Sequence, residues 1–536
     1  MGMDNNATRR DILRFLGAGL GVAFVPDMLA QVHPAHAAGV LSVKDFGATG
    51  DGHTFDTPAI NRAIEAAATK GGGTVWFPPG TYLCYSIRLK SNIALYIDEG
   101  ATIVGADTPM EGFPAGSNKG YDPAEPDTFA AAYQDWGHNH WHNSLIWGED
   151  LHDIAILGPG LIWGRGLSRG AYKDTPTAEK PGVGNKAIGL KNCRNVTFRD
   201  FSVLKGGHFA ILVTGVDNIT IDNLKIDTNR DGMDIDCCKN VRISNCSVNS
   251  PWDDGICPKS SFALGYARIT ENVTITNCFV TGKYETGGMI DGSNKLLTDK
   301  SAPGHKPPYN GRIKCGTESN GGFRNIAISN CVFERSRGFA LQSMDGAQIE
   351  DILITNITMR EASNGPFYIR QGGRMRGPAG TAVGTIRRVR ISNFTSQDAM
   401  TRNACMIQGF PGHLVEDISL SDIYCHQVGG ADVFNGIPPE VDPKLTEPGS
   451  FPNQPAHGLF VRHAKNIEAR NLEFAVAAAD GRPAVWMQDV QGADFFRLQI
   501  PVGGTAFDLH DVSGFRVVGS RTIRDMTDDA AITTTL

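Results

Sequence analysis

The sequence lacks several features that would place it in a simple class. Its net charge of −7 over 536 residues is too small to attract nucleic acid or an anionic membrane surface. Beyond the N-terminal region, no stretch approaches the roughly 18 apolar residues that a membrane-spanning helix needs. The eleven cysteines include no C-x-x-C pair, and the adjacent Cys237 and Cys238 are poorly spaced for zinc. We therefore expect a mature chain with no nucleic acid partner, no membrane partner, no metal and no cofactor.

The N-terminus has the pattern of an export signal. Arg9 and Arg10 precede an apolar stretch that ends near Leu29, and residues 35–37 form a small-residue cleavage site. This pattern is typical of a twin-arginine signal peptide, and a membrane anchor is the alternative. We predict that residues 1–37 are removed and that the mature domain, residues 38–536, lies in the periplasm or outside the cell. Because the cysteine number is odd and such proteins are usually folded before export, we expect mostly free, buried thiols.

A short pattern recurs from about residue 190 onward: a polar pair, an alternating apolar strand, Asn, and a second short strand. Copies begin at Arg194, Asp217 and Lys239, and their second residues are 23 and 22 positions apart (218 − 195 and 240 − 218). The strands are rich in β-branched residues and no helical period lies between them, which argues against leucine-rich or helical repeats. The pattern predicts an all-β fold, a single-stranded right-handed parallel β-helix that forms one elongated domain.

Two further features fit this fold. Residues 56–69 predict a helix with Asp56 or Thr57 as N-cap and one apolar face, which would cap the N-terminal end of the solenoid. Asn and Cys also stand at equivalent points of successive copies, where stacking would produce an Asn ladder and an inward row of thiols. These pairs are Asn245-Cys246, Asn277-Cys278 and Asn330-Cys331.

One neighbourhood of the repeats is unusually acidic. Asp231 precedes Asp253 by 22 residues (253 − 231), which is one coil, so Asp231 and the pair Asp253 and Asp254 should lie on adjacent coils. Carboxylates this close raise at least one pKa, so that one carboxylic acid stays protonated beside ionised partners. An acid and a base on either side of a water molecule is the arrangement of inverting glycosidases. A position in a turn between strands would explain any one of these Asp residues. Three Asp residues in register on adjacent coils favour a catalytic site.

Two basic segments are candidates for binding an acidic sugar. Arg312 and Lys314 point to the same face of a strand, where Arg can bind a carboxylate through two nitrogens. Tyr368 and Arg370 belong to a later Arg-rich turn and form a second candidate. A solvated basic surface is the alternative for both. Rings near the first coils could line a further sugar site: Trp136, His138, His140 and Trp141.

These motifs resemble those of glycoside hydrolase family 28, the polygalacturonase family, which hydrolyses α-linked galacturonides in pectin by inversion on a parallel β-helix. The family's N-T-D motif is similar to residues 229–231, its Asp pair to residues 253–254, and its R-I-K motif to residues 312–314. Residues 43–52 and 73–82 are similar to pectin-active β-helices more widely. The resemblance extends over nearly all of the mature chain.

The resemblance implies a role for each carboxylate. Asp253 would be the general acid, while Asp231 and Asp254 would hold and deprotonate the water. The family's G-H-G motif is missing, because the corresponding segment, residues 286–293, has no His. His208 and His305 are candidates to replace it. The residues expected to bind substrate are Asn229, Arg230, His208, Arg312, Lys314, Tyr368 and Arg370.

We therefore predict a monomeric hydrolase that acts on pectic polysaccharides or oligosaccharides of the galacturonan or rhamnogalacturonan type. An enlarged loop, residues 281–310, favours action at chain ends. One alternative is a Ca²⁺-dependent lyase on the same fold, in which the clustered Asp bind the ion. Such a lyase would release an unsaturated sugar and lose activity with a chelator. The other alternative is a non-catalytic β-helix that binds glycans.

Overall fold

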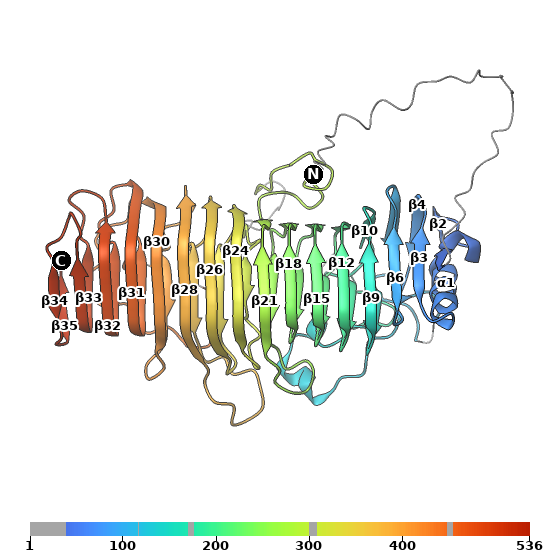
Figure 1. Cartoon of the computed structure of the whole chain (residues 1–536), viewed down its shortest axis with the longest axis horizontal. Helices are drawn as coiled ribbons and strands as arrows, with labels where there is room; N and C mark the ends of the chain where they lie inside the picture. The colour runs from blue at the N-terminus through green and yellow to red at the C-terminus, as the bar shows by residue number, and fades with distance from the viewer. Residues whose placement is uncertain (1–38, 116, 170–175, 300–307, 448–453) are drawn as a thin grey trace, which may run out of the picture. The chain divides into compact units, whose positions relative to one another are not determined.

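The computed structural model describes residues 39–115, 117–169, 176–299, 308–447 and 454–536. Residues 39–536 form one compact unit of short parallel strands stacked coil upon coil, which confirms the predicted right-handed parallel β-helix (Figure 1). The predicted signal, residues 1–37, and His305 lie outside the described residues. In the described part of the chain, no helix is long and apolar enough to cross a membrane.

The strands form three parallel stacks. The stack that carries the carboxylates, called the site stack below, comprises β5 (Ile87–Arg88), β8 (Ser144–Glu149), β11 (Lys186–Lys191), β14 (Phe209–Thr214), β17 (Asp231–Asp236), β20 (Ile256–Lys259), β23 (Ile313–Cys315), β25 (Phe339–Ser343), β27 (Phe367–Gln371), β29 (Cys405–Gln408) and the start of β31 (Leu459–Ala478). The long stack comprises β1 (Val40–Ser42), β3 (Gly73–Phe77), β6 (Ile93–Ile97), β9 (His152–Leu157), β12 (Arg194–Arg199), β15 (Asp217–Asp222), β18 (Lys239–Ser244), β21 (Thr270–Thr276), β24 (Phe323–Glu334), β26 (Gln348–Arg360), β28 (Thr385–Gln397), β30 (Val415–Gly429), β31, β32 (Val485–Gln499) and β33 (Phe507–Val518). The third stack comprises β2 (Asp51–Phe55), β4 (Gly80–Cys84), β7 (Ala101–Gly105), β10 (Leu161–Trp163), β13 (Ser202–Leu204), β16 (Lys225–Asp227), β19 (Ser247–Asn249) and β22 (Phe279–Thr281), and it joins the second half of β24.

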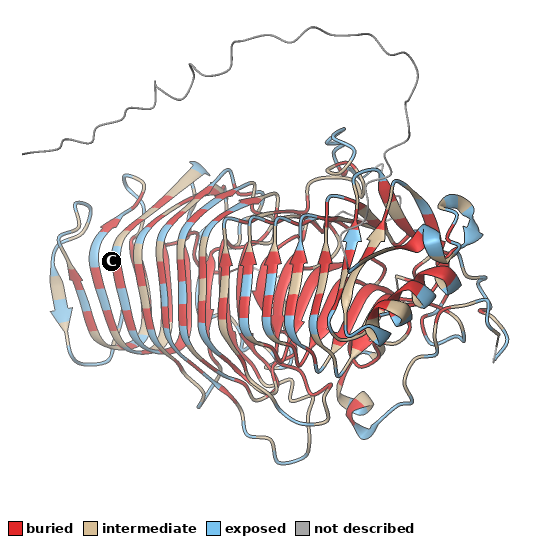
Figure 2. Ribbon diagram, turned by 45° about the vertical axis from the view of Figure 1, so that its right-hand side comes forward, coloured by how far each residue is buried: buried red, intermediate tan, exposed pale blue. Residues whose placement is uncertain are grey.

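Side chains alternate between core and surface along the strands, and the turns between stacks rely on Asn (Figure 2). Asn245 and Asn277 have φ of 57° and 54°, in the left-handed region that Asn tolerates better than most residues. The Asn277 amide donates to Asn245 Oδ1 at 3.4 Å, as the predicted ladder requires, but Asn330 donates to Thr276 Oγ1 instead. All eleven cysteines are free and buried, which confirms the expectation for the thiols.

Both ends of the solenoid are covered. At the N-terminal end, α1 (Thr57–Thr69) buries the predicted apolar face, Ile60, Ala63, Ile64 and Ala67. Asp56 is the N-cap residue, but its carboxylate accepts from the backbone N–H of Thr49 and Gly50 rather than from the first helical turn. At the other end, β34 (Met526–Asp528) and β35 (Ile532–Thr535) pair antiparallel with β33. The short 3₁₀ helices are η2 (Val43–Phe46), η3 (Phe129–Tyr133) and η4 (Trp136–His138).

Two long connections cover the outward face of the site stack. The front connection, the described part of residues 106–143, packs Trp141 on Phe209. The rear connection, the described part of residues 430–458, packs on a buried row that includes Tyr368 and Phe460. The coils with the acidic residues lie between the two covered regions.

Candidate active site

The register of the site stack brings the three carboxylates together. Strand β17 begins at Asp231 and pairs with β20, and the turn just before β20 contains Asp253 and Asp254. One carboxylate oxygen from each residue lies within 4.8 Å of the other two. The Asp254 backbone N–H donates to Asp231 Oδ1 at 3.3 Å, which fixes the turn against the strand. A spacing of one coil therefore places all three at one point of the surface.

The three carboxylates have different environments. Asp231 is 4% exposed, and burial, together with the nearby charges of Asp253 and Asp234, raises its pKa well above the ordinary value. Asp254 is 1% exposed, but it contacts Arg312 Nε at 2.6 Å and also the Lys314 ammonium. Although burial opposes ionisation, these two cations lower the pKa of Asp254. The cluster therefore contains one carboxyl that retains a proton readily and one that stays ionised.

Asp253 is the most accessible of the three, with a side chain that is 29% exposed. Its Oδ2 lies 3.1 Å from Arg230 Nη2, so the arginine that departs from the family motif contacts the residue expected to be the acid. The Ser250 hydroxyl approaches the carbonyl oxygens of Asp253 and Asp254 at 3.0 and 3.1 Å. This turn presents Asp253 to solvent while Asp254 points inward.

Two other predicted binding residues also lie beside the cluster. Asn229 is 6% exposed, and its Oδ1 has no hydrogen-bond partner among the described residues. His208 immediately precedes Phe209, which pairs in register with Asp231. The limited access of water, and then the charge of Arg230, lower the pKa of His208 well below its ordinary value. A neutral imidazole and an amide oxygen therefore border the carboxylates.

Tyr368 and Arg370 are not brought to the carboxylates, because β27 lies two strands beyond β23 in the site stack. Both side chains are buried beneath the rear connection. Arg370 donates to the carbonyl oxygens of Gly409 and Asp442, so it contacts the connection that covers it. The two residues therefore lie on a later coil, where they stay a second candidate for binding a uronate carboxylate.

The first part of the enlarged loop contacts the third stack. The backbone N–H groups of Met289 and Ile290 donate to Asp227 on that stack. The strand that pairs with β20 next to Asp254 is β23, which Arg312 immediately precedes. Residues 282–310 are an insertion between β22 and β23.

A buried charge network that sequence reasoning missed adjoins Asp231. His138 Nε2 lies 3.4 Å from Asp234 Oδ2, and Lys259 Nζ lies 3.8 Å from the same oxygen and 2.8 Å from Glu318. All four side chains are buried. Alternation along the strands could have indicated Asp234 and Lys259. His138 belongs to η4, in an irregular segment. Because that segment has no repeat, its contact with Asp234 could not be predicted from the coil spacing.

The rings near the first coils have separate roles. Trp136 and His140 stack with centroids 4.1 Å apart, and both line a surface hollow between the front connection and residues 178–183. Trp141 is buried, and its Nε1 donates to Thr214 Oγ1 at 3.1 Å. Trp136 is therefore partly exposed at this hollow, whereas His140 and Trp141 are buried.

The carboxylates are poorly suited to Ca²⁺, which takes six to eight oxygen ligands. Asp254 is already paired with two cations, and Asp253 is paired with Arg230. Lys259 lies close to Asp234. A divalent ion among these groups would meet like charge on several sides, so the donor set favours acid–base chemistry over the ion-dependent elimination that a lyase performs.

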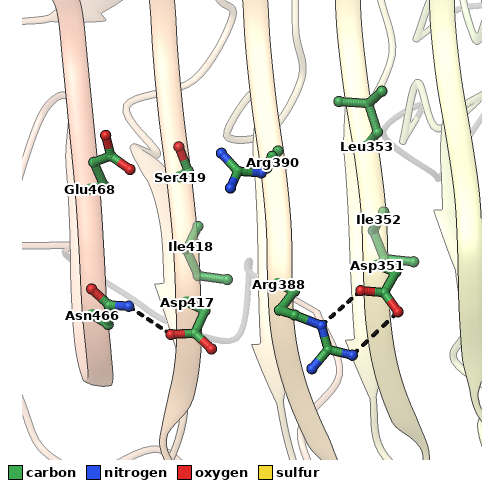
Figure 3. A pocket seen from close by; sticks show the side chains of 10 residues that line it. All are labelled: Asp351, Ile352, Leu353, Arg388, Arg390, Asp417, Ile418, Ser419, Asn466 and Glu468. Carbon is green, nitrogen blue, oxygen red and sulfur yellow. Dashed lines mark hydrogen bonds and ion pairs between the residues drawn. The ribbon is translucent and has the colours of Figure 1, made fainter.

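A separate hollow lies on the long stack, over β26, β28, β30 and β31 (Figure 3). Asp351 and Arg388 form an ion pair at 2.7 Å at one side of it, and Asn466 donates to Asp417 at the other. Because these strands belong to another stack, this surface is distinct from the carboxylate cluster.

This combination of a parallel β-helix and a carboxylate cluster defines a class of carbohydrate-active proteins, and comparison with known proteins gives the family. Residues 126–292 match the model of glycosyl hydrolases family 28, and residues 40–120 match that of rhamnogalacturonase A/epimerase, pectate lyase-like proteins. The match of residues 126–292 to this family confirms the resemblance of the motifs.

The individual relatives include a polygalacturonase and a binding protein. The chain is 24% identical over 355 residues to a "Probable polygalacturonase" of Vitis vinifera, covering 61% of this chain and 61% of the relative. It is 32% identical over 277 residues to plasmin and fibronectin-binding protein A of Streptococcus pneumoniae, covering 48% of this chain and 32% of the relative. The chain thus spans less than two thirds of either relative. The fold is similar to that of an exopolygalacturonase from Thermotoga maritima (TM-score 0.59, 19% identity, 81% of this chain and 91% of that chain).

Proposed function

We propose that this protein hydrolyses glycosidic bonds in pectic polysaccharides or oligosaccharides, of the galacturonan or rhamnogalacturonan type, with inversion and from chain ends. The observation that carries this proposal is the cluster itself, in which Asp231, Asp253 and Asp254 each place a carboxylate oxygen within 4.8 Å of the other two. Inverting hydrolysis needs an acid and a base on either side of a water molecule. The match of residues 126–292 to the family model supports the reaction class.

The proposed mechanism divides the reaction among the three carboxyl groups. Asp253, the most exposed, gives its proton to the glycosidic oxygen as the bond from that oxygen to the sugar C1 breaks. A water molecule attacks C1 and loses its proton to Asp231, whose raised pKa makes it a stronger base than an ordinary Asp. Asp254, held ionised by Arg312 and Lys314, orients the water and stabilises the positive charge that develops on the sugar ring.

Two observations support action at chain ends. The front connection reaches the cluster through His138, which contacts Asp234. On the other side, the rear connection reaches Arg312 through Glu447, at 2.7 Å. Few coils between these contacts remain free for a long chain to extend along the solenoid axis.

The proposal also includes the cellular location. The twin arginines, Arg9 and Arg10, and the cleavage site at residues 35–37 support twin-arginine export and an extracytoplasmic location. The proposed enzyme works as a monomer. Replacement of both arginines by Lys should keep the full-length chain in the cytoplasm. Cell fractionation measures this outcome, and normal export of that variant would contradict the route.

The function is tested with purified mature protein and a panel of pectic oligosaccharides. We expect saturated products, unchanged activity in the presence of a chelator, and loss of turnover in Asp253→Asn. An unsaturated product that absorbs ultraviolet light, or inhibition by the chelator, would favour the lyase instead.

A second candidate is a β-helix that binds glycans or host proteins without cleaving them, and the match to the pneumococcal binding protein favours it. This candidate predicts that the wild-type protein and Asp253→Asn bind the same oligosaccharides equally and that neither releases a product. Turnover by the wild-type protein would exclude it as the main function.

A further inference from the structure

Arg312 lies where the sugar beside the scissile bond would meet the enzyme. It immediately precedes β23, the strand next to the Asp253–Asp254 turn. Its Nε contacts Asp254, and its two terminal nitrogens point the other way. Such a guanidinium fork is shaped to bind a carboxylate through two parallel hydrogen bonds, as a uronic acid would require.

A carboxylate of the protein itself already occupies this fork. Glu447 Oε1 lies 2.7 Å from Arg312 Nη2, and Glu447 Oε2 lies 3.1 Å from Arg312 Nη1. The same Oε2 accepts from Arg337 Nη1 at 3.2 Å. Arg312 is buried, whereas the Glu447 side chain is 33% exposed, so water reaches this bidentate pair from the side of Glu447 only. Although burial opposes it, the charge of Arg312 lowers the pKa of Glu447 and keeps the carboxylate ionised.

The segment that leads to Glu447 is fixed to the solenoid at several points. The Thr446 carbonyl accepts from the Gln342 side chain, and the Pro443 carbonyl accepts from Gly373 N–H at 2.8 Å. Nearer the start of the connection, the carbonyl oxygens of Pro438 and Pro439 accept from Arg462. These contacts anchor the segment and hold Glu447 in position beside Arg312.

Glu447 offsets part of the positive charge beside Asp254. Arg312 and Lys314 provide two positive charges and Asp254 and Glu447 two negative ones, while Arg337 adds a third cation that pairs with Glu447. A sugar carboxylate at this position would have to displace Glu447 or lie against it unpaired. A neutral sugar would not have to displace Glu447, and it would leave no carboxylate unpaired.

We propose that Glu447 takes the place of a sugar carboxylate at Arg312 and so selects a neutral residue, such as a deoxyhexose or hexose, at the position beside Asp254. This inference rests on the proposed hydrolase function and narrows its substrate class. The preferred pectic substrate then alternates neutral and acidic sugars, and an unbroken galacturonide chain is a poor one.

The test compares Glu447→Gln, which keeps the size of the side chain but removes its charge, with the wild-type protein. The kcat/KM is measured for oligogalacturonides and for oligosaccharides in which rhamnose alternates with galacturonate. We expect the wild-type protein to prefer the alternating substrate. In Glu447→Gln the ratio should move roughly ten- to hundredfold toward oligogalacturonides, the effect of regaining a charge-assisted pair. The matched control is Glu440→Gln, since Glu440 lies in the same connection but pairs with Arg462 and His463.

An unchanged ratio in Glu447→Gln, or a wild-type preference for oligogalacturonides, would overturn the inference. Calorimetry separates this result from failure of the proposed function. Trigalacturonate should bind more tightly to Asp253→Asn/Glu447→Gln than to Asp253→Asn. Should that gain appear while the wild-type protein cleaves nothing, the hydrolase proposal fails and the role of Glu447 stands. Hydrolysis with no gain in affinity contradicts the role of Glu447 alone. If Glu447→Gln unfolds, Glu447→Ala provides the same comparison.

Discussion

Carboxylate–guanidinium pairs occur in two regions of this solenoid with opposite consequences. On the long stack, Asp351 and Arg388 pair at 2.7 Å, with side chains 46% and 43% exposed (Figure 3). On the site stack, Asp254 and Arg312 pair at 2.6 Å, and both are almost fully buried. Water screens the first pair, which therefore contributes little to stability. Burial of the second makes each charge depend on its partners and sets the proton affinities of the neighbouring carboxyl groups.

The largest effect should come from breaking the buried pair. Asp254→Asn leaves Arg312 and Lys314 without their shared carboxylate, which should cost about 3–5 kcal/mol of unfolding free energy. It should also lower kcat by a factor of at least about 10². Chemical denaturation and steady-state kinetics measure both quantities.

The control for that experiment is Asp351→Asn, which breaks the exposed pair on the long stack. We expect an unchanged kcat and an unchanged denaturation midpoint. If both variants behaved alike, the contrast between the two regions would be wrong.

The second effect separates chemistry from stability within the cluster. Asp253 is 29% exposed and makes its ion pair at the surface, so Asp253→Asn should fold like the wild-type protein. Because the general acid is lost, kcat should fall by a factor of about 10² to 10⁴ while substrate still binds. A loss of stability equal to that of Asp254→Asn would contradict this division of roles.

The third effect concerns pH. Burial and neighbouring carboxylates raise the pKa of Asp231, so in the native protein this base takes up a proton well above the ordinary Asp value of about 4. As the pH falls through that raised pKa, the base is neutralised and kcat/KM should decline. A pH–rate profile measures this acidic limb. A limb near pH 4 would show that Asp231 does not act as the base.

The smallest effect should come from the network beside the cluster. His138 contacts Asp234 from the front connection and is 4% exposed. We expect His138→Ala to lower kcat about tenfold, a change of about 1.4 kcal/mol in activation free energy, because Asp234, whose charge acts on Asp231, loses this buried neighbour. His142→Ala is the control, because His142 lies in the same segment but pairs with Glu149. Equal activity of the two variants would show that His138 has no role in the active site.

Periodicity predicted the features that repeat with the coil. The spacing of 22 residues was sufficient to place Asp231 beside Asp253 and Asp254, because stacked coils keep register. The alternation of side chains along a strand also placed Arg312 and Lys314 on one face. Their contacts with Asp254 arise because β23 pairs directly with β20. Strand pairing between neighbouring coils sets these features, so they can be predicted without knowing contacts between residues far apart in the sequence.

Irregular segments account for what the sequence did not predict. His138 and Glu447 reach the cluster from connections that have no period. Tyr368 and Arg370 occupy outward positions that would be exposed on a bare coil, and only the rear connection buries them. Contacts made by covering connections are long-range, so no window of the sequence contains both partners.

The most direct measurement is the configuration of the sugar that the enzyme releases. Purified mature protein is incubated with a pectic oligosaccharide, and the first product is followed by mass spectrometry and by nuclear magnetic resonance before mutarotation. Hydrolysis by the three carboxylates predicts a saturated product from the chain end with inverted anomeric configuration. A product with retained configuration, or an unsaturated one, would contradict it.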